Sequence, residues 1–217
     1  MKKVVIIGSS GAGKTTLAQA LEPILNLKVY HLDRMFWMRD WKGKDRETRI
    51  DILQKISPEK QWIIEGTYPD SSVPGLEAAD TIIFLDRSPF TCLCRVIARH
   101  WKSSTRRRDI PEGCADILNG HRMWKVLTFP FRDRKRLIQK LDAYKSKRII
   151  RLRSDKEVKD FLARQKLGAD EREQEAKYAL PDALVFIACC ALAIVCRLVM
   201  ACSAVFSGQR KRECANT

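Results

Sequence analysis

The feature that most constrains the fold of this chain is a glycine-rich stretch near its start, directly after the apolar run Val4–Ile7. The residues of this stretch are Gly8, Ser9, Ser10, Gly11, Ala12, Gly13, Lys14, Thr15 and Thr16. A strand, then glycines at this spacing, then Lys-Thr opening a helix, is the pattern of a phosphate-binding loop. A turn that only joins a strand to a helix would explain the glycines but not the Lys-Thr pair. We therefore expect the loop to bind a nucleotide.

The chemistry of such a loop follows from its residue types. Glycines allow consecutive backbone N–H groups to point inward at phosphate oxygens. The positive end of the following helix faces the same anion. We expect Lys14 to reach the β- and γ-phosphates and the Thr15 hydroxyl to ligate Mg²⁺.

The net positive charge of the chain is concentrated in residues 1–170. The 217 residues carry a formal net charge of +15, and residues 1–170 hold 35 Lys+Arg against 21 Asp+Glu. Such a surplus suits phosphate-bearing ligands, nucleic acid or an anionic membrane surface. Four of the eight cysteines lie in one apolar run near the end of the chain, so we expect free thiols in a reducing compartment and no disulfide framework.

Short apolar runs alternate with helical patterns along the first 167 residues. The runs expected to form strands are Val4–Ile7, Leu27–Tyr30, Trp62–Ile64, Thr81–Leu85 and Arg148–Leu152. The stretches expected to form helices are Thr15–Leu25, Thr48–Ile56, Pro89–Trp101 and a helix that Ser154 and Glu157 begin with a capping box. This alternation predicts an α/β protein with a parallel sheet covered on both faces.

Carboxylates follow three of the predicted strands, at the edge where parallel sheets bind their ligands. Asp33 is a candidate to accept a proton from an acceptor hydroxyl or to help hold Mg²⁺, with helix capping as the alternative. Glu65 is a candidate to contact the metal, against the alternative of a solvated strand end. Asp86 is a weaker candidate, because it would also serve to orient Arg87 or to cap the helix at Pro89.

A segment of about residues 95–136 is expected to act as a lid. Between positions 95 and 108 it holds six basic residues and no acid. We expect Arg99, Arg106, Arg107 and Arg108, as a group, to neutralise charge that develops during phosphoryl transfer. A solvated basic helix face accounts for part of the same run.

A second basic cluster keeps a rival function open. It consists of Arg132, Arg134, Lys135 and Arg136, and with Trp101 and Trp124 it forms the mixture of cations and aromatic rings that single-stranded nucleic acid binds. Packing of the tryptophans in the core of a lid helix explains them equally well. The spacing of the three histidines indicates no metal site.

In chain order, the segments GSSGAGKTTLA, VYHLDRMFW, WIIEGTY, DTIIFLDRSPFTCLCRV and RLRSDKEVKDFL resemble the bacterial topology modulation proteins over about residues 1–163. These are P-loop proteins similar to adenylate kinase. The resemblance implies a three-layer fold with a five-stranded parallel sheet in the order 2-3-1-4-5, ATP as ligand, and kinase activity.

The chain departs from the pattern of that family at three places. Glu65-Gly66-Thr67-Tyr68 stands where Asp-Gly-Asn-Tyr is expected, an arginine is missing near Pro74, and Arg87 directly follows Asp86. These departures concern the acceptor side more than the ATP side.

The end of the chain differs from the rest. We expect a charged linker helix at 168–182, an apolar helix at 183–206 and a basic tail at 207–217. Residues 183–206 carry one charge, Arg197, and as a helix would span a bilayer about 30 Å thick. A membrane anchor, an oligomerisation helix and a tail foreign to the domain are the alternatives.

Together these observations predict a cytoplasmic, Mg²⁺-dependent P-loop protein that transfers the γ-phosphoryl group of ATP to a nucleotide or another small acceptor. Tethering to a membrane by 183–206 remains an alternative to a free cytoplasmic protein. The rival function is that of a basic, nucleic-acid-binding ATPase that affects DNA topology. The sequence identifies neither the acceptor nor the oligomeric state.

Overall fold

The computed structural model describes residues 1–68, 72–102, 110, 113–114 and 120–178. The chain divides into two units, Met1–Ala169 and Asp170–Thr217. Of the second unit, only residues 170–178 are described, and they form the end of a helix. The predicted apolar helix at 183–206 and the basic tail at 207–217 therefore lie outside the described residues.

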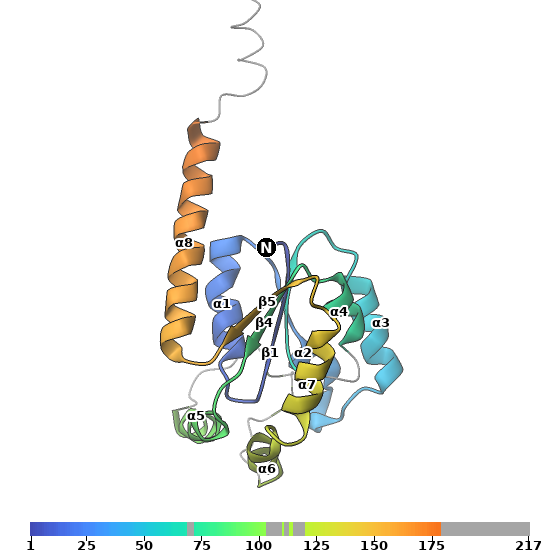
Figure 1. Ribbon diagram of the computed structural model, residues 1–217. Coiled ribbons are helices and arrows are strands. Elements are labelled where there is room, and N and C mark those ends of the chain that lie inside the picture. The colour runs from blue at the N-terminus through green and yellow to red at the C-terminus, as the bar shows by residue number, and fades with distance from the viewer. Residues whose placement is uncertain (69–71, 103–109, 111–112, 115–119, 179–217) are drawn as a thin grey trace, which may run out of the picture. The chain divides into compact units, whose positions relative to one another are not determined.

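A five-stranded parallel sheet lies at the centre of the first unit (Figure 1). Its strand order is β2-β3-β1-β4-β5, as expected for a P-loop fold of the nucleotide-kinase type. The strands are β1 (Lys3–Gly8), β2 (Val29–His31), β3 (Trp62–Glu65), β4 (Thr81–Leu85) and β5 (Arg148–Leu152). Every residue of β3 and β4 is buried, and all of them except Glu65 and Thr81 are apolar, as is typical of parallel strands covered on both faces.

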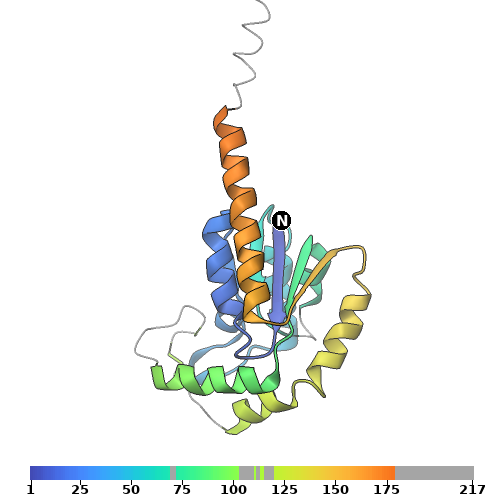
Figure 2. The ribbon, with the colours of Figure 1, turned by 60° about the vertical axis from the view of Figure 1, so that its left-hand side comes forward.

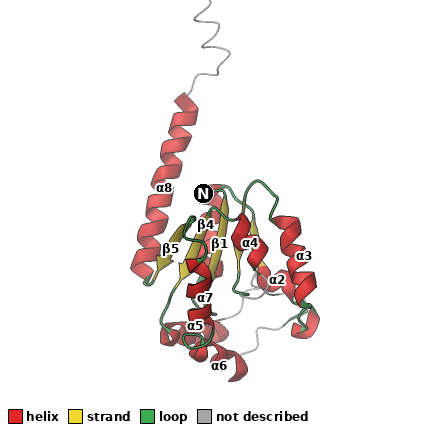
Figure 3. Ribbon diagram, turned by 45° about the vertical axis from the view of Figure 1, so that its right-hand side comes forward, coloured by secondary structure: helices red, strands yellow, loops and turns green. Residues whose placement is uncertain are grey.

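Helices cover both faces of the sheet, so the fold has three layers (Figures 1 and 3). One layer contains α1 (Lys14–Leu25) and the start of α8 (Asp155–Tyr178), and the other contains α2 (Leu32–Phe36), α3 (Arg46–Ile56), α4 (Val73–Ala78) and α7 (Asp133–Asp142). Successive residues of a strand point to opposite faces. Val4 and Ile6 of β1 accordingly belong to one apolar cluster, and Val5 and Ile7 belong to the other.

Two helices lie beyond the carboxyl ends of the strands, where the phosphate loop also lies (Figure 2). These are α5 (Pro89–Lys102) and α6 (Gly120–Thr128), which belong to the segment predicted as a lid. A short 3₁₀ helix, η1 (Arg39–Trp41), follows α2. The functional site is therefore built at one edge of the sheet.

The second strand begins two residues later than the sequence pattern predicts. Leu27 is buried but does not belong to β2, because the chain turns at Asn26, whose φ of 51° ends α1. The backbone N–H groups of both residues donate to the Glu22 carbonyl. Leu27 thus packs at the end of α1. In the sequence, an apolar residue at such a position cannot be distinguished from the first residue of a strand.

Ser154 and Glu157 cap the start of α8 as predicted, except that the return bond to Glu157 comes from Arg153, the residue before the cap. The Glu157 N–H donates to Ser154 Oγ at 3.1 Å, and the Glu157 carboxylate accepts from the backbone N–H of Arg153 at 2.9 Å. The helix runs from Asp155 to Tyr178 and includes residues 168–178 of the predicted linker helix, whose last residues, 179–182, lie outside the described residues. None of the helices in the described part of the chain is long and apolar enough to cross a membrane.

Candidate active site

The phosphate loop joins β1 to α1 in a conformation that requires glycine. Gly11 and Gly13 have φ values of +80° and +97°, which side chains rarely allow. A Cβ atom at Gly11 would also lie 2.3 Å from the Cys92 carbonyl oxygen, so the loop packs directly on α5. The loop is therefore held by both its own backbone and the neighbouring helix.

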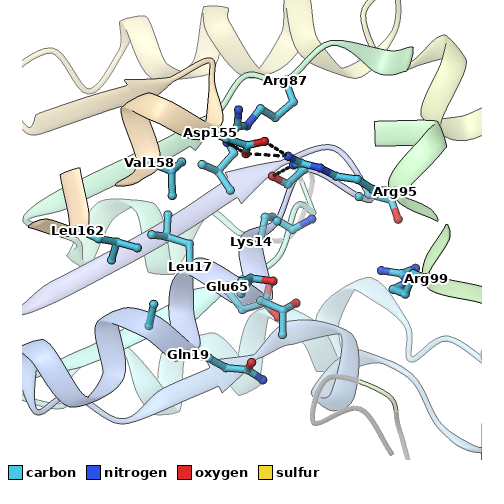
Figure 4. A pocket seen from close by; sticks show the side chains of 18 of the residues that line it. Lys14, Leu17, Gln19, Glu65, Arg87, Arg95, Arg99, Asp155, Val158 and Leu162 are labelled. Carbon is cyan, nitrogen blue, oxygen red and sulfur yellow. Dashed lines mark hydrogen bonds and ion pairs between the residues drawn. The ribbon is translucent and has the colours of Figure 1, made fainter. Parts of the chain in front are cut away.

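A cavity of about 600 Å³ opens above this loop, within the usual size range of small-molecule sites. Residues 10–17 line its floor, and its other polar walls come from distant parts of the chain. Figure 4 shows apolar side chains on one side, from Leu17, Val158 and Leu162, and the guanidinium of Arg99 on the other. The remaining charged residues that line the cavity are Lys14, Asp33, Glu65, Arg87, Arg95 and Asp155.

Lys14 and Thr15 line the cavity at the point where the loop passes into α1. The Lys14 Nζ atom donates to the Ser9 carbonyl oxygen at 3.1 Å, so its ammonium group folds back over the loop. The Thr15 hydroxyl donates to Glu65 Oε1 at 3.1 Å. The Glu65 carboxylate is almost fully buried and also lies 2.8 Å from His31 Nδ1.

The Thr15 hydroxyl and the Glu65 carboxylate offer oxygen atoms, the ligand type that Mg²⁺ takes in proteins, alongside water and phosphate. In this structure the two groups share a hydrogen bond of 3.1 Å. The described residues include no group of three or more His, Cys, Asp or Glu side chains that would enclose a metal.

Asp33 lies in the first turn of α2 and lines the same cavity. Its Oδ1 atom accepts a hydrogen bond from the Tyr68 hydroxyl, which in turn accepts one from Trp37 Nε1 at 2.8 Å. The cap of α2 is His31, whose side chain makes no capping hydrogen bond. Asp33 therefore points into a side-chain network rather than serving as the helix cap.

Two arginines that line the cavity, Arg87 and Arg95, both bind the carboxylate of Asp155 (Figure 4). Arg95 Nη2 donates to Asp155 Oδ2 at 2.6 Å, and Arg87 Nη2 donates to Oδ1 at 2.8 Å. The hydrogen bond from Arg95 is the main reason that the pKa of Asp155 lies below its usual value, and the charge of Arg87 adds to it. Arg95 also donates to the Ala12 carbonyl oxygen at 3.4 Å, which ties this cluster to the phosphate loop.

The expectations for the lid arginines have different outcomes. Arg99 lines the cavity, whereas Arg106, Arg107 and Arg108 lie outside the described residues. Arg95, which shares a helix face with Arg99, lines the cavity as well.

The expectation for Asp86 needs correction, because this carboxylate neither orients Arg87 nor caps α5. It accepts from Arg134 Nε at 2.7 Å and from Arg151 Nε at 2.8 Å. Burial opposes ionisation of Asp86, but these two arginines outweigh it and hold the pKa below its usual value. Asp86 thus joins α7 to β5, and Arg134 of the second basic cluster is engaged with it.

Three residues in or beside the site were given no role of their own from the sequence, namely His31, Tyr68 and Asp155. All three follow a strand of the sheet or lie at its end, so the rule for carboxyl edges places them near the ligand. Their partners come from other elements, and a strand-end rule does not name partners.

Comparisons with known proteins find likeness only in structure. No protein-family model matches the chain, and no curated protein sequence matches it. Among solved structures, the shikimate kinase of Bacteroides thetaiotaomicron is similar, with 18% identity, a TM-score of 0.47, and coverage of 77% of this chain and 97% of that one.

A second similar structure is the shikimate kinase of Acinetobacter baumannii in complex with shikimate. It has 14% identity and a TM-score of 0.48, and the match covers 76% of this chain and 90% of that one. At such values the likeness does not bear on function. The fold assignment rests instead on the sheet order and on the phosphate loop itself.

Proposed function

We propose that this protein is a magnesium-dependent P-loop kinase that transfers the γ-phosphoryl group of ATP to a nucleotide or another small acceptor. The observation that carries the proposal is the meeting of three features in one cavity. These are the loop that ends in Lys14 and Thr15, the buried Glu65, and the carboxylate of Asp33. The resemblance to the topology modulation proteins supports the same function and belongs to this proposal.

The donor side of the reaction uses the loop. Backbone N–H groups of residues 8–15 and the Lys14 ammonium would hold the β- and γ-phosphates. Thr15 and Glu65 would hold Mg²⁺, which neutralises charge on the phosphate oxygens when it is bound. The apolar side chains of Leu17, Val158 and Leu162 offer a wall for the nucleoside.

The acceptor side uses the carboxylate and the arginines. Asp33 would take the proton of the acceptor hydroxyl, and the acceptor oxygen would bond to the γ-phosphorus. The bond between the γ-phosphorus and the oxygen that bridges it to the β-phosphate would break at the same time. ADP then leaves with the electrons of the broken bond. Arg99, with Arg106 and Arg107 from the lid, would compensate the charge on the moving phosphoryl group.

The first test compares Lys14→Ala with Lys60→Ala in the full-length protein. Both variants remove one positive charge, but Lys60 is exposed at a turn and does not line the cavity. A charge-assisted hydrogen bond contributes about 1.5–3 kcal/mol, so Lys14→Ala should weaken ATP binding about 10- to 150-fold. Titration calorimetry with Mg²⁺ and a nonhydrolysable ATP analogue measures this, and thermal melting checks the fold.

The reaction itself requires a screen of acceptors. Labelled ATP is offered with nucleosides, nucleotides and small alcohols, and transfer of the label is followed. Phosphorylation of one of these classes that is lost in Asp33→Asn supports the proposal. ATP affinity that is equal in wild type and Lys14→Ala, or a complete absence of acceptor turnover, contradicts it.

A second candidate function has its own observation. Trp101, Trp124 and Phe131 are 82%, 62% and 77% exposed, so burial in a lid core does not explain the tryptophans. Residues 120–148, which include Trp124 and Phe131, hold ten Lys+Arg and two Asp+Glu. Exposed rings beside basic side chains suit the stacking of bases from a single strand.

Filter binding to single-stranded DNA at rising salt tests this candidate. A strand held by four phosphate contacts should give a slope of log K against log salt near −3. Trp124→Ala should weaken binding by about 1–3 kcal/mol if a base stacks on this ring. Binding with no dependence on salt or on Trp124 would remove the nucleic-acid function from consideration.

A further inference from the structure

A chain of two hydrogen bonds leads from Trp37, the residue after α2, through Tyr68 to Asp33 in the first turn of the same helix, and the chemistry of the groups sets its direction. The Trp37 indole N–H can only donate, and it donates to the Tyr68 hydroxyl oxygen at 2.8 Å. Tyr68 has a single hydroxyl proton, and it donates this proton to Asp33 Oδ1. The carboxylate of Asp33 therefore receives a donor whose own position is held by a second donor.

The tyrosine ring is itself tightly placed. It lies edge-on to Phe36, with ring centroids 4.8 Å apart, and Phe36 is fully buried. The Arg49 guanidinium carbon lies 5.7 Å from the centroid of the Tyr68 ring and 5.8 Å from that of Trp37. A ring packed in this way cannot swing its hydroxyl away from Asp33 without disturbing its neighbours.

The same segment is tied to the phosphate loop. The Thr67 hydroxyl accepts from the Gly8 N–H at 2.8 Å and donates to the Gly8 carbonyl oxygen at 2.7 Å. Tyr68 is the next residue along the chain. The group that holds Asp33 and the turn that begins the phosphate loop are therefore parts of one short connection.

Tyr68 also keeps its proton. Burial raises the pKa of its hydroxyl far above the usual value, and the negative charge of Asp33 raises it further. The hydroxyl thus stays a neutral donor at every pH at which the protein would work. It would not compete with Asp33 for a proton.

We propose that Tyr68, backed by Trp37, is a positioning residue that fixes the Asp33 carboxylate so that its second oxygen meets the acceptor. The inference rests on the proposed kinase function and adds a residue to it. Asp33 Oδ2 takes the proton as the acceptor O–H bond breaks and the new O–P bond forms. That proton does not pass along the chain, because the indole N–H at its far end cannot accept one. It leaves through the cavity.

The test pairs Tyr68→Phe with Tyr30→Phe in the full-length protein. Tyr30 is a matched control, because its hydroxyl also donates to a carboxylate, that of Glu59, at 2.7 Å. Neither Tyr30 nor Glu59 lines the cavity. The probe is Mg-ATP with water as acceptor, and with the acceptor found in the screen where turnover is faster.

The expected result separates positioning from binding. Misplacement of a catalytic group by about 1 Å can reduce turnover about 100-fold. We expect kcat of Tyr68→Phe to fall about 10- to 100-fold, with the KM for ATP changed less than about threefold, and both values of Tyr30→Phe to match wild type. An unchanged kcat in a folded Tyr68→Phe protein overturns the inference, while the proposed kinase function stands.

A second measurement does not depend on turnover. In ¹⁵N-labelled protein each tryptophan gives one indole N–H signal, and that of Trp37 is assigned with Trp37→Phe. Loss of its acceptor should shift this signal in Tyr68→Phe and leave it in place in Tyr30→Phe. An unshifted signal overturns the inference. Wild-type protein that neither binds nor turns over ATP would instead refute the proposed function, and the indole signal would still report on the hydrogen-bond chain.

Discussion

The close contact between Gly11 of the phosphate loop and the backbone of Cys92 in α5 provides a test of how the site is built. Gly11→Ala adds one carbon atom that would lie 2.3 Å from the Cys92 carbonyl oxygen and 2.9 Å from Val96 Cγ2. The first of these atoms belongs to the backbone of α5, which cannot yield as the end of a flexible side chain can. The variant must therefore either move the loop or move the helix.

The magnitude has two parts. A non-glycine residue in the left-handed region costs about 1–2 kcal/mol, and an added carbon in a well-packed place costs about 1–3 kcal/mol more. Gly11→Ala should thus lower the free energy of unfolding by about 2–5 kcal/mol. Gly13→Ala shares only the first cost, because the nearest atom to its new carbon, Arg95 Nη1, is 3.9 Å away.

Urea unfolding without nucleotide, followed by circular dichroism, measures both variants against wild type. We expect Gly11→Ala to be less stable than Gly13→Ala by about 1–3 kcal/mol, with similar slopes in urea. Equal losses in the two variants would refute the reasoning, because they would mean that the Cys92 carbonyl does not lie against the loop. Such a result would also weaken the placement of Arg95 and Arg99, which α5 carries into the cavity.

Three further variants test other parts of the fold. Asp86→Asn should cost about 1–3 kcal/mol at pH 7, since two arginines lose a charged acceptor. Because the folded pKa of Asp86 is lowered, its contribution is present above about pH 5 and is lost as the pH falls below about 4, so urea unfolding should show a smaller difference from wild type at pH 3. Ser154→Ala should cost about 1 kcal/mol of helix capping, and an unchanged melting temperature would count against the capping box. Gly168→Ala should instead stabilise by about 0.5–1 kcal/mol, because an added carbon meets nothing within 4 Å inside α8, and any loss of stability in urea would show a contact there.

Much of the fold could be predicted from sequence because its central strands are covered on both faces and form short apolar runs. The run Thr81–Leu85, which is buried throughout, and the run Arg148–Leu152, which is partly exposed at the edge of the sheet, are predicted and observed with the same bounds. The phosphate loop is equally readable, since its glycines meet local backbone requirements within a few residues. The start of the second strand was misplaced at Leu27, because a buried residue beyond a helix end is as apolar as one in a strand.

Individual residues of the candidate site could be predicted from the sequence, but their hydrogen-bond partners could not. Strand ends point to Asp33 and Glu65 as members of one edge, and the structure brings both to the cavity. The role of Asp86 was misjudged because its partners, Arg134 and Arg151, are 48 and 65 residues away in the chain. Nothing in the residues next to Asp86 distinguishes these partners from Arg87.

What the sequence determined by itself is the alternation of strands and helices, the phosphate loop, and the edge of the sheet at which polar side chains collect. These depend on local backbone preferences and on which faces are buried, and both leave a periodic trace in the chain. Only the tertiary structure decided the hydrogen bonds between side chains. Tyr68 donates to Asp33, and His31 Nδ1 lies within hydrogen-bond distance of Glu65. Asp155 accepts from both Arg87 and Arg95. A hydrogen bond between side chains depends on placing two separate elements to within a fraction of an ångström, and that placement comes from the packing of the whole core.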